Sequence, residues 1–146
     1  MTAKVHGEKA KEGLRRVQQN IQAAAHFILA AGITAAEQSA KASTLYRDRT
    51  GKTRASVKGS INAGGMSGKV VARGASIFLE NGTKAHTITA RNGGMLRFFV
   101  NGQAVFRRSV RHPGTGPRPT MGNARYHAEL SIGYAAEIYL NEAIGS

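Results

Sequence analysis

Residues 112–120 read HPGTGPRPT, and this segment restricts the possible folds more than any other part of the chain. It holds all three prolines of the 146 residues, together with two glycines. Proline fixes φ and has no backbone N–H, so neither a helix nor an interior strand can run through the segment. It must form a turn or an extended loop, and it separates a long preceding region from a short final one.

The region just before this proline-rich loop carries the strongest strand signal. Two apolar-rich runs, 95–100 and 104–110, flank Asn101–Gly102, the dipeptide that two-residue hairpin turns prefer. Residues 53–62 alternate between apolar or small and polar side chains, and residues 69–75 form another short apolar run. The pattern predicts a small antiparallel sheet of about four strands within residues 53–110, with a polar loop over 83–94.

Helical periodicity lies on both sides of this β region. Apolar residues recur at three- and four-residue steps from Leu14 to Ala35, which predicts a long helix over residues 9–44. Residues 1–8 show no periodicity and are expected to form a flexible arm. Gly32 is a candidate position for a kink or a break. The alanine-rich second half of this helix suits either a close helical neighbour or cover for the sheet. After the loop at residues 111–120, Leu130, Tyr134 and Ile138 predict a closing helix over residues 121–143.

These elements define an α+β fold in a single domain, residues 1–146, with the C-terminal helix packed on the sheet. The core is expected to be small, because aromatic residues make up 6% of the chain and there are 18 glycines. Such a domain is expected to need neighbours for full stability. The most apolar window, residues 23–36, is shorter than the roughly 20 residues of a membrane span, so no membrane contact is predicted.

The net charge of +13 is unevenly distributed along the chain. Residues 41–125 carry sixteen cationic and two carboxylate side chains, whereas residues 126–146 carry three carboxylates and no Lys or Arg. A basic middle of this strength predicts an anionic neighbour, either nucleic acid or the acidic surface of another protein.

Residue patterns typical of enzymes are weak throughout. The chain has no cysteine, and its five histidines show no helical metal-binding spacing, although His86 and His112 flank the hairpin and could approach each other. Glu80 is one of two carboxylates in the basic middle, and it is expected to form a structural salt bridge with Arg97 or Arg107. Phosphate-loop and dinucleotide motifs are absent. We therefore expect no enzymatic activity, no cofactor and no metal.

Sequence-specific DNA-binding motifs are also absent, since there is no zinc finger and no helix-turn-helix with a basic second helix. Phe98, Phe99 and Phe106 alternate within apolar strands, which favours core positions over base-stacking positions. Two alternatives remain open beside a structural role. They are a stand-alone basic nucleic-acid-binding protein or nuclease, and a protein associated with RNA or the ribosome.

Three ordered pieces of the chain carry a resemblance to a known family. They are DRTGKTRASV at residues 48–57, FLENGTKAHTI at 78–88, and LRFFVNGQAVFRRSVRHPGTGPRPTM at 96–121. They are similar to the gene-product-ten-like family of phage minor tail components, which are tail-completion and head–tail joining proteins. The matching positions are Gly51, Arg54, Ser56, Glu80, Gly82, Thr83, His86, Ile88, Leu96, Arg97, Phe98, Gly102, Val105, Phe106, Val110, His112, Pro113, Gly114, Thr115, Pro117 and Pro119. Thr53 and Thr120–Met121 depart from the family pattern.

The resemblance implies a non-enzymatic virion protein of a long-tailed bacteriophage, assembled in the host cytoplasm and located in the neck, at the head-proximal end of the tail. It implies a homo-oligomeric ring, with a hexamer favoured and a dodecamer as the alternative, through which double-stranded DNA passes. Its implied partners are the connector or stopper and the tail terminator or tail tube proteins, with non-specific DNA contact. We expect the partner- or DNA-facing residues to be Arg107, Arg108, Arg111, His112, Pro113 and Arg118. We expect Glu80, Gly82, His86 and Arg97 to hold the loop structure.

Overall fold

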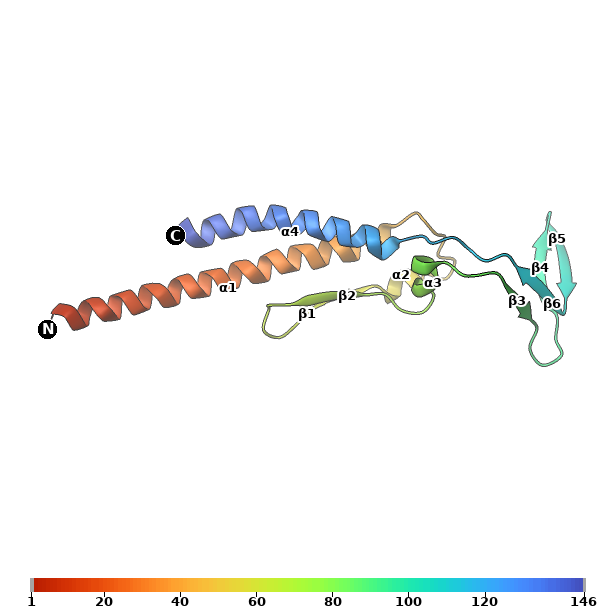
Figure 1. Cartoon of the computed structure of the whole chain (residues 1–146), viewed down its shortest axis with the longest axis horizontal. Helices are drawn as coiled ribbons and strands as arrows, with labels where there is room; N and C mark the ends of the chain where they lie inside the picture. Colours follow the sequence, from red (N-terminus) through yellow and green to blue (C-terminus); the bar gives the residue numbers. More distant parts are fainter. Residues whose placement is uncertain (1, 146) are drawn as a thin grey trace.

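The computed structural model describes residues 2–145 and has an elongated shape (Figure 1). Two antiparallel helices, α1 (Thr2–Ala42) and α4 (Thr120–Gly145), lie side by side and form the body of the molecule. The other elements are α2 (Lys52–Ser56), α3 (Ser76–Asn81), β1 (Lys58–Ile61), β2 (Gly68–Val71), β3 (His86–Thr89), β4 (Leu96–Val100), β5 (Gln103–Arg107) and β6 (Ser109–His112). The α+β class predicted from the sequence is confirmed.

Helix α1 is longer and more regular than the sequence pattern indicated. The flexible arm expected at residues 1–8 is wrong for residues 2–8, which belong to the helix, while Met1 lies outside the described residues. Residues 2–8 contain Ala3, Lys4 and Glu8, which favour helix, and no proline. No break occurs at Gly32, where the missing side chain leaves room for a close approach of α4. A Cβ at Gly32 would lie 2.5 Å from Cγ1 of Ile132.

The alanines of α1 contact both candidate neighbours, a helix and a sheet. Ala36 and Ala40 are buried against Ala124 of α4 and Val57, which directly precedes β1. Val70 of β2 and the first turns of α4 complete this small cluster, so the C-terminal helix does contact the β1–β2 sheet. Most of α4 nevertheless packs along α1.

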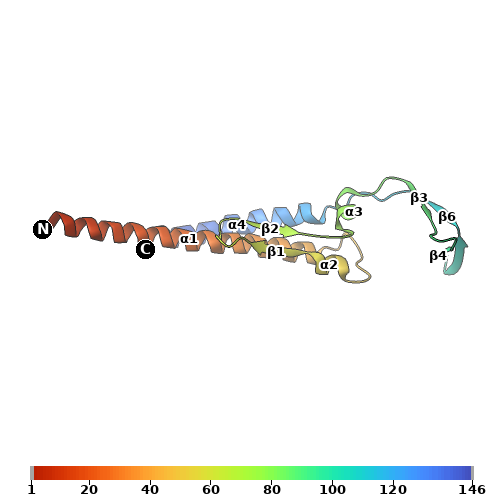
Figure 2. The same ribbon diagram turned by 90° about the horizontal axis from the view of Figure 1, so that it is seen from below.

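The sequence predicted one small sheet of about four strands. Residues 2–145 instead form six strands in three separate two-stranded antiparallel sheets, β1–β2, β3–β6 and β4–β5. The β1–β2 hairpin packs on α1 in the middle of the molecule, whereas the other two pairs lie at the end away from the two termini (Figures 1 and 2). The chain from β2 to β3 bends at the left-handed glycines Gly74 and Gly82, and the three prolines lie in the returning segment between β6 and α4.

Residues 53–56 were predicted as strand but form helix α2. Gly51, with φ of 70°, turns the chain, and the side chain of Asp48 accepts a hydrogen bond from the backbone N–H of Arg54 at 2.8 Å. This backbone donor lowers the pKa of Asp48 below its ordinary value. The local hydrogen bond outweighs the alternating pattern of a strand.

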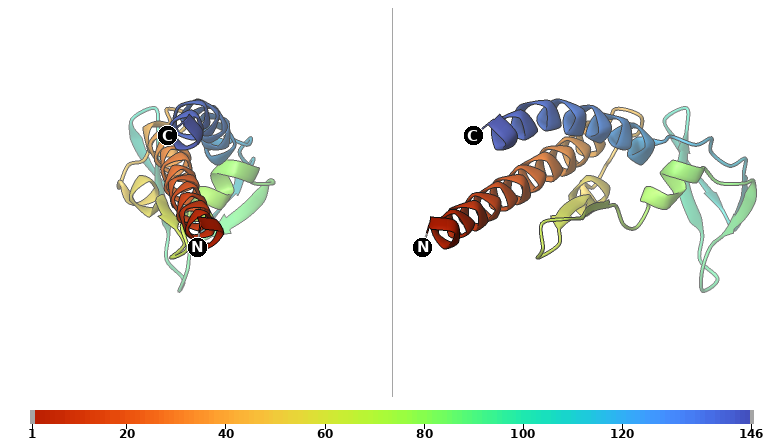
Figure 3. Two further views of the ribbon diagram at one scale, coloured as in Figure 1. Left: turned by 90° about the vertical axis from the view of Figure 1, so that its left-hand side faces the viewer. Right: turned by 60° about the vertical axis from the view of Figure 1, so that its left-hand side comes forward.

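The buried core is small and consists mainly of alanine. Among the described residues, the buried apolar side chains are Ala24, Ala36, Ala40, Tyr46, Val57, Ala124, Ala135 and Ala143. Many larger apolar side chains remain exposed, including Leu14 at 71% and Tyr134 at 71%. The body is therefore a thin two-helix layer with one hairpin beneath it, as Figure 3 shows from two further directions.

Candidate functional site

The proline-rich loop forms one side of a projecting arm, which we define as residues 82–119. Two extended segments lead from the body to the outer pair β3–β6, and the inner hairpin β4–β5 lies between these strands in the sequence. We call residues 86–112, which carry both pairs, the tip (Figure 1).

The base of the arm is fixed by a reciprocal contact between its two segments. Thr83 and Thr115 exchange backbone hydrogen bonds of 2.9 and 3.0 Å. Gly82 and Gly114 have φ values of 69° and 91°, and a Cβ on either one would collide with the backbone of the opposite segment. Glycine is required at both positions, because only glycine adopts this conformation readily and leaves room for the facing chain.

Glu80 joins the base of the arm to the body. Its carboxylate accepts hydrogen bonds of 2.6 Å from the hydroxyl of Thr120 and from the backbone N–H of Met121, in the first turn of α4. The predicted salt bridge of Glu80 with Arg97 or Arg107 is therefore wrong. An anionic acceptor at a helix N-terminus satisfies otherwise unpaired donors and interacts favourably with the helix dipole. Its role is structural, as expected, but it acts on a helix that sequence reasoning did not connect with it.

The inner hairpin forms as predicted. Its turn places Asn101 at φ 50° and Gly102 at φ 81°, as a two-residue turn of the favoured hairpin type requires. The expected second run, 104–110, divides at Arg108 into β5 and β6.

Strand β3 was missed, because residues 86–89 were predicted as part of a polar loop. The alternating threonines in HTIT were the available signal.

The arm is strongly basic and has no carboxylate of its own. Residues 81–128 contain no Asp or Glu. Within the described part of the chain, no cation of the arm has a carboxylate within ion-pair distance. The exposed cations of the arm are Lys84, Arg91, Arg97, Arg107, Arg108, Arg111 and Arg118. Unpaired positive charges of this density attract an anionic surface.

The predicted partner-facing residues fall into two places. Arg107, Arg108 and Arg111 lie in the tip, at the end of β5, in the bend and in β6. His112 ends β6 and Pro113 begins the returning segment. Arg118 lies instead at the base, where its backbone N–H donates to the carbonyl of Leu79 at 2.6 Å. The structure thus brings together the tip arginines but not Arg118.

One face of the inner hairpin carries exposed aromatic side chains beside an arginine. Phe99 and Phe106 are 64% and 50% exposed, so their predicted core positions are wrong. Arg97 pairs across the strands with Phe106, and its guanidinium lies 5.2 Å from the ring centre of Phe99. Phe98, on the other face, is only partly buried. No residue of the arm is fully buried, so the arm has no core in which these rings could be enclosed. For this reason the core positions predicted from the apolar alternation do not form.

His86 and His112 are direct partners across β3 and β6, with ring centres 5.1 Å apart. Nδ1 of His86 donates to the carbonyl of Lys84, which leaves Nε2 free to accept. Nδ1 of His112 accepts from the N–H of Gly114, so the proton of the neutral ring is on Nε2. The described residues contain no group of three or more metal-binding side chains. The two rings lie next to each other where β3 and β6 pair.

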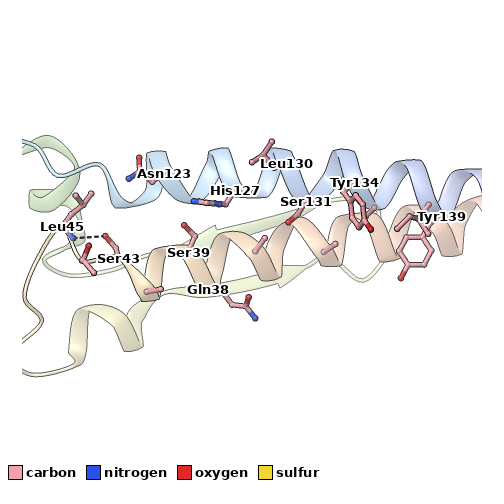
Figure 4. Close-up of a pocket in the computed structure, with 16 residues that line it drawn as sticks. Gln38, Ser39, Ser43, Leu45, Asn123, His127, Leu130, Ser131, Tyr134 and Tyr139 are labelled. Carbon is pink, nitrogen blue, oxygen red and sulfur yellow. Dashed lines mark hydrogen bonds between the residues drawn. The ribbon is translucent and has the colours of Figure 1, made fainter.

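A second surface feature is a shallow groove of about 1030 Å³ along the seam between α1 and α4 (Figure 4). Its lining mixes small, apolar and polar side chains and contains no Asp, Glu, Lys or Arg; the labelled residues are Gln38, Ser39, Ser43, Leu45, Asn123, His127, Leu130, Ser131, Tyr134 and Tyr139. Tyr139 stacks on Phe27 of α1 with ring centres 5.3 Å apart. No helix of the described residues has both the length and the apolar character needed to cross a membrane.

Comparisons of the chain with models of protein families, with curated proteins and with solved structures found no match.

Proposed function

We propose that this chain is a structural protein of a bacteriophage virion, a ring component that completes the tail and joins it to the capsid connector. The family comes from the sequence resemblance described above. One property of the fold supports an assembly role in particular, which is the large surface that a single copy exposes.

A compact monomer of 15.5 kDa exposes about 7200 Å² by the usual scaling with mass. This chain exposes 11180 Å², an excess of about 4000 Å². Obligate interfaces bury roughly 2000–5000 Å² in total, so the excess is of the size that stable subunit contacts would cover. In a ring, each copy contributes two patches, one to each neighbour.

The proposed ring is a hexamer, with a dodecamer as the alternative, in the phage neck between the connector or stopper and the tail terminator or tube. Its partners are these proteins, further copies of itself and, non-specifically, the DNA passing through. The proposed role is placement of neighbours, with no catalytic step and no cofactor.

The test is complementation in a phage that lacks this protein. The wild-type chain should restore joined, infectious particles, whereas Arg107→Glu with Arg108→Glu should leave separate heads and tails while the purified variant keeps its helical circular dichroism. The same charge change at Arg15 and Arg16 of α1 is the matched control for net charge. Infectious particles from the Arg107/Arg108 variant would show that these arginines are not needed for joining.

A basic, carboxylate-free arm also suits a stand-alone nucleic-acid-binding protein or nuclease. That alternative predicts salt-sensitive DNA binding by the monomer, or cleavage of plasmid in the presence of magnesium or manganese. Unaltered plasmid after long incubation, together with full complementation by the wild-type chain, would remove the nuclease.

A further inference from the structure

Two surfaces of this chain complement each other but cannot meet within one copy. The first is the aromatic and basic face of the tip, formed by Arg97, Phe99 and Phe106, with the exposed Arg108 two residues after Phe106. The second is an exposed ridge on α4, formed by Leu130, Tyr134 and Ile138 with Glu137 and Glu142 beside them.

The ridge on α4, whose three apolar side chains also border the groove between α1 and α4, has carboxylates beside it. Leu130, Tyr134 and Ile138 are spaced four residues apart and are 55%, 71% and 39% exposed. Glu137 lies three residues after Tyr134, and Glu142 four residues after Ile138, so both carboxylates neighbour the ridge. In the described residues, neither carboxylate has a cation within ion-pair distance.

The tip offers the complementary chemistry. Its exposed rings, Phe99 and Phe106, lie beside Arg97, and neighbouring Arg108 is also exposed. Aromatic residues and arginine are the types enriched at the energetic centres of protein interfaces. Duplex DNA keeps its bases stacked, so large exposed rings on the tip suit a protein surface better than a phosphate backbone.

The two surfaces project in opposite directions from the base of the arm (Figures 1 and 2). The returning segment 113–119 spans roughly 20 Å when extended, and it carries the tip away from α4. Tyr134 lies 14 residues into α4, about 21 Å along the helix in the other direction. The tip of one copy therefore has to reach the ridge of another copy.

We propose that the tip of each copy docks on the α4 ridge of the next copy, giving a head-to-tail contact. Because the two surfaces are different, the contact repeats from copy to copy and closes into a ring when the rotation permits. This inference rests on the homo-oligomeric part of the proposed function and identifies the surfaces that form it.

The experiment uses charge reversal on each surface of the full chain. The tip variant carries Arg97→Glu and Arg108→Glu, and the ridge variant carries Glu137→Arg and Glu142→Arg. In sedimentation velocity, the wild-type chain should form an oligomer that weakens with salt, and each variant alone should associate at least about tenfold more weakly. Arg15→Glu with Arg16→Glu is the matched control and should assemble as the wild type does.

Recombining the charges makes the test specific. The two variants mixed together should assemble, because the reversed tip faces the reversed ridge and the native tip faces the native ridge. A chain carrying all four substitutions should also self-assemble, but not with the wild-type chain. Circular dichroism establishes that each variant is folded.

The proposal is overturned if the wild-type chain is monomeric or if either variant assembles as strongly as the wild type. It is also overturned if the chain that carries all four substitutions does not self-assemble. Loss of DNA binding with an unchanged oligomer would also overturn it and would assign the tip to DNA. A separate experiment tests the proposed function, which is contradicted if the wild-type chain does not restore joined particles in the complementation assay. Particles that join with the tip variant in place leave that function standing and reject this contact.

Discussion

Gly82 and Gly114 are the residues on which the arm depends most directly. Each has a left-handed backbone conformation and faces the backbone of the opposite segment without space for a side chain. The sequence contains other glycines in the same region, and only their surroundings distinguish them. Gly116, two residues away, has open space where a Cβ would lie and no such conformation.

Replacing Gly82 or Gly114 with Ala should therefore loosen the base of the arm. Backbone strain of this kind costs about 1–3 kcal/mol, which corresponds to a loss of protection of about 5- to 150-fold. The measurement is hydrogen exchange at the amides of Thr83 and Thr115, which bond to each other across the base. Gly116→Ala should leave this protection unchanged, and equal effects at all three glycines would contradict the assignment.

Glu37 links α1 to the β1–β2 hairpin. It pairs with Lys41, and its second oxygen accepts a hydrogen bond of 2.6 Å from the N–H of Gly59. The Lys41 ammonium first, and the Gly59 donor second, lower the pKa of Glu37 below its ordinary value of 4.5. A carboxyl whose pKa is lowered by folding contributes stability above its unfolded pKa and loses it as the pH falls through the folded pKa.

The Glu37→Gln variant should therefore be less stable than the wild type near neutral pH, and the difference should shrink as the pH falls below about 4.5. Urea unfolding of both chains, followed from about pH 7 to about pH 3, measures this. Lys41→Gln removes the largest cause of the lowered Glu37 pKa, so it should reduce the change of this stability difference with pH. A difference that grows toward low pH would reverse the sign of the argument.

At the scale of elements, the body depends on how closely α1 and α4 approach. Gly32 is buried in this seam opposite Ile132, whereas Gly13 of the same helix has open space around it. The two glycines have equal intrinsic helix propensity, so a difference between them reports packing.

Gly13→Ala should raise the free energy of unfolding by about 0.5–1 kcal/mol, because alanine is the better helix former. Gly32→Ala should lose this gain, since the new Cβ would lie 2.5 Å from Cγ1 of Ile132. In an Ile132→Ala background the gain should return, with a coupling of about 1 kcal/mol. Chemical unfolding of the wild type, Gly32→Ala, Ile132→Ala and the double variant measures this coupling. Additive effects would mean that the two helices do not touch at Gly32.

At the scale of the whole molecule, the arm and the body are separate in their packing. No described residue of the arm is fully buried, and the cluster of buried residues with its packed neighbours lies in α1, α4, β2, Val57 and Ala72. The connection between them is the extended base together with the Glu80 cap on α4.

Replacing residues 86–112 with a short glycine-containing turn should leave the two-helix body folded. We expect the midpoint of thermal unfolding to shift by only about 2–4 °C, which corresponds to roughly 1 kcal/mol for a chain of this size. Far-ultraviolet circular dichroism during heating measures it. Loss of cooperative unfolding would show that the tip contributes to the core.

Several features of the candidate site follow from local sequence. The Asn101–Gly102 turn, the strands on either side of it and the extended character of residues 113–119 depend on the conformations that asparagine, glycine and proline allow. The separation of basic and acidic regions can be read directly from residue order.

Other features could not be predicted, because they depend on which distant segments lie together. The cap of Glu80 on α4 joins residues forty apart, and the register of His86 with His112 joins residues twenty-six apart. Phe99 and Phe106 have the alternation of core residues, but the projecting tip has nothing to cover them.

The sequence by itself determined the two helices, the inner hairpin, the rigid loop and the positive charge of the arm, since each arises from neighbouring residues or simple periodicity. Only the tertiary structure decided that the arm projects, that its strands pair separately from the β1–β2 hairpin, and that its aromatic face stays exposed. Periodicity reports which side chains share a face, but burial requires an opposing surface. For the arm, we propose that this surface belongs to another copy of the chain.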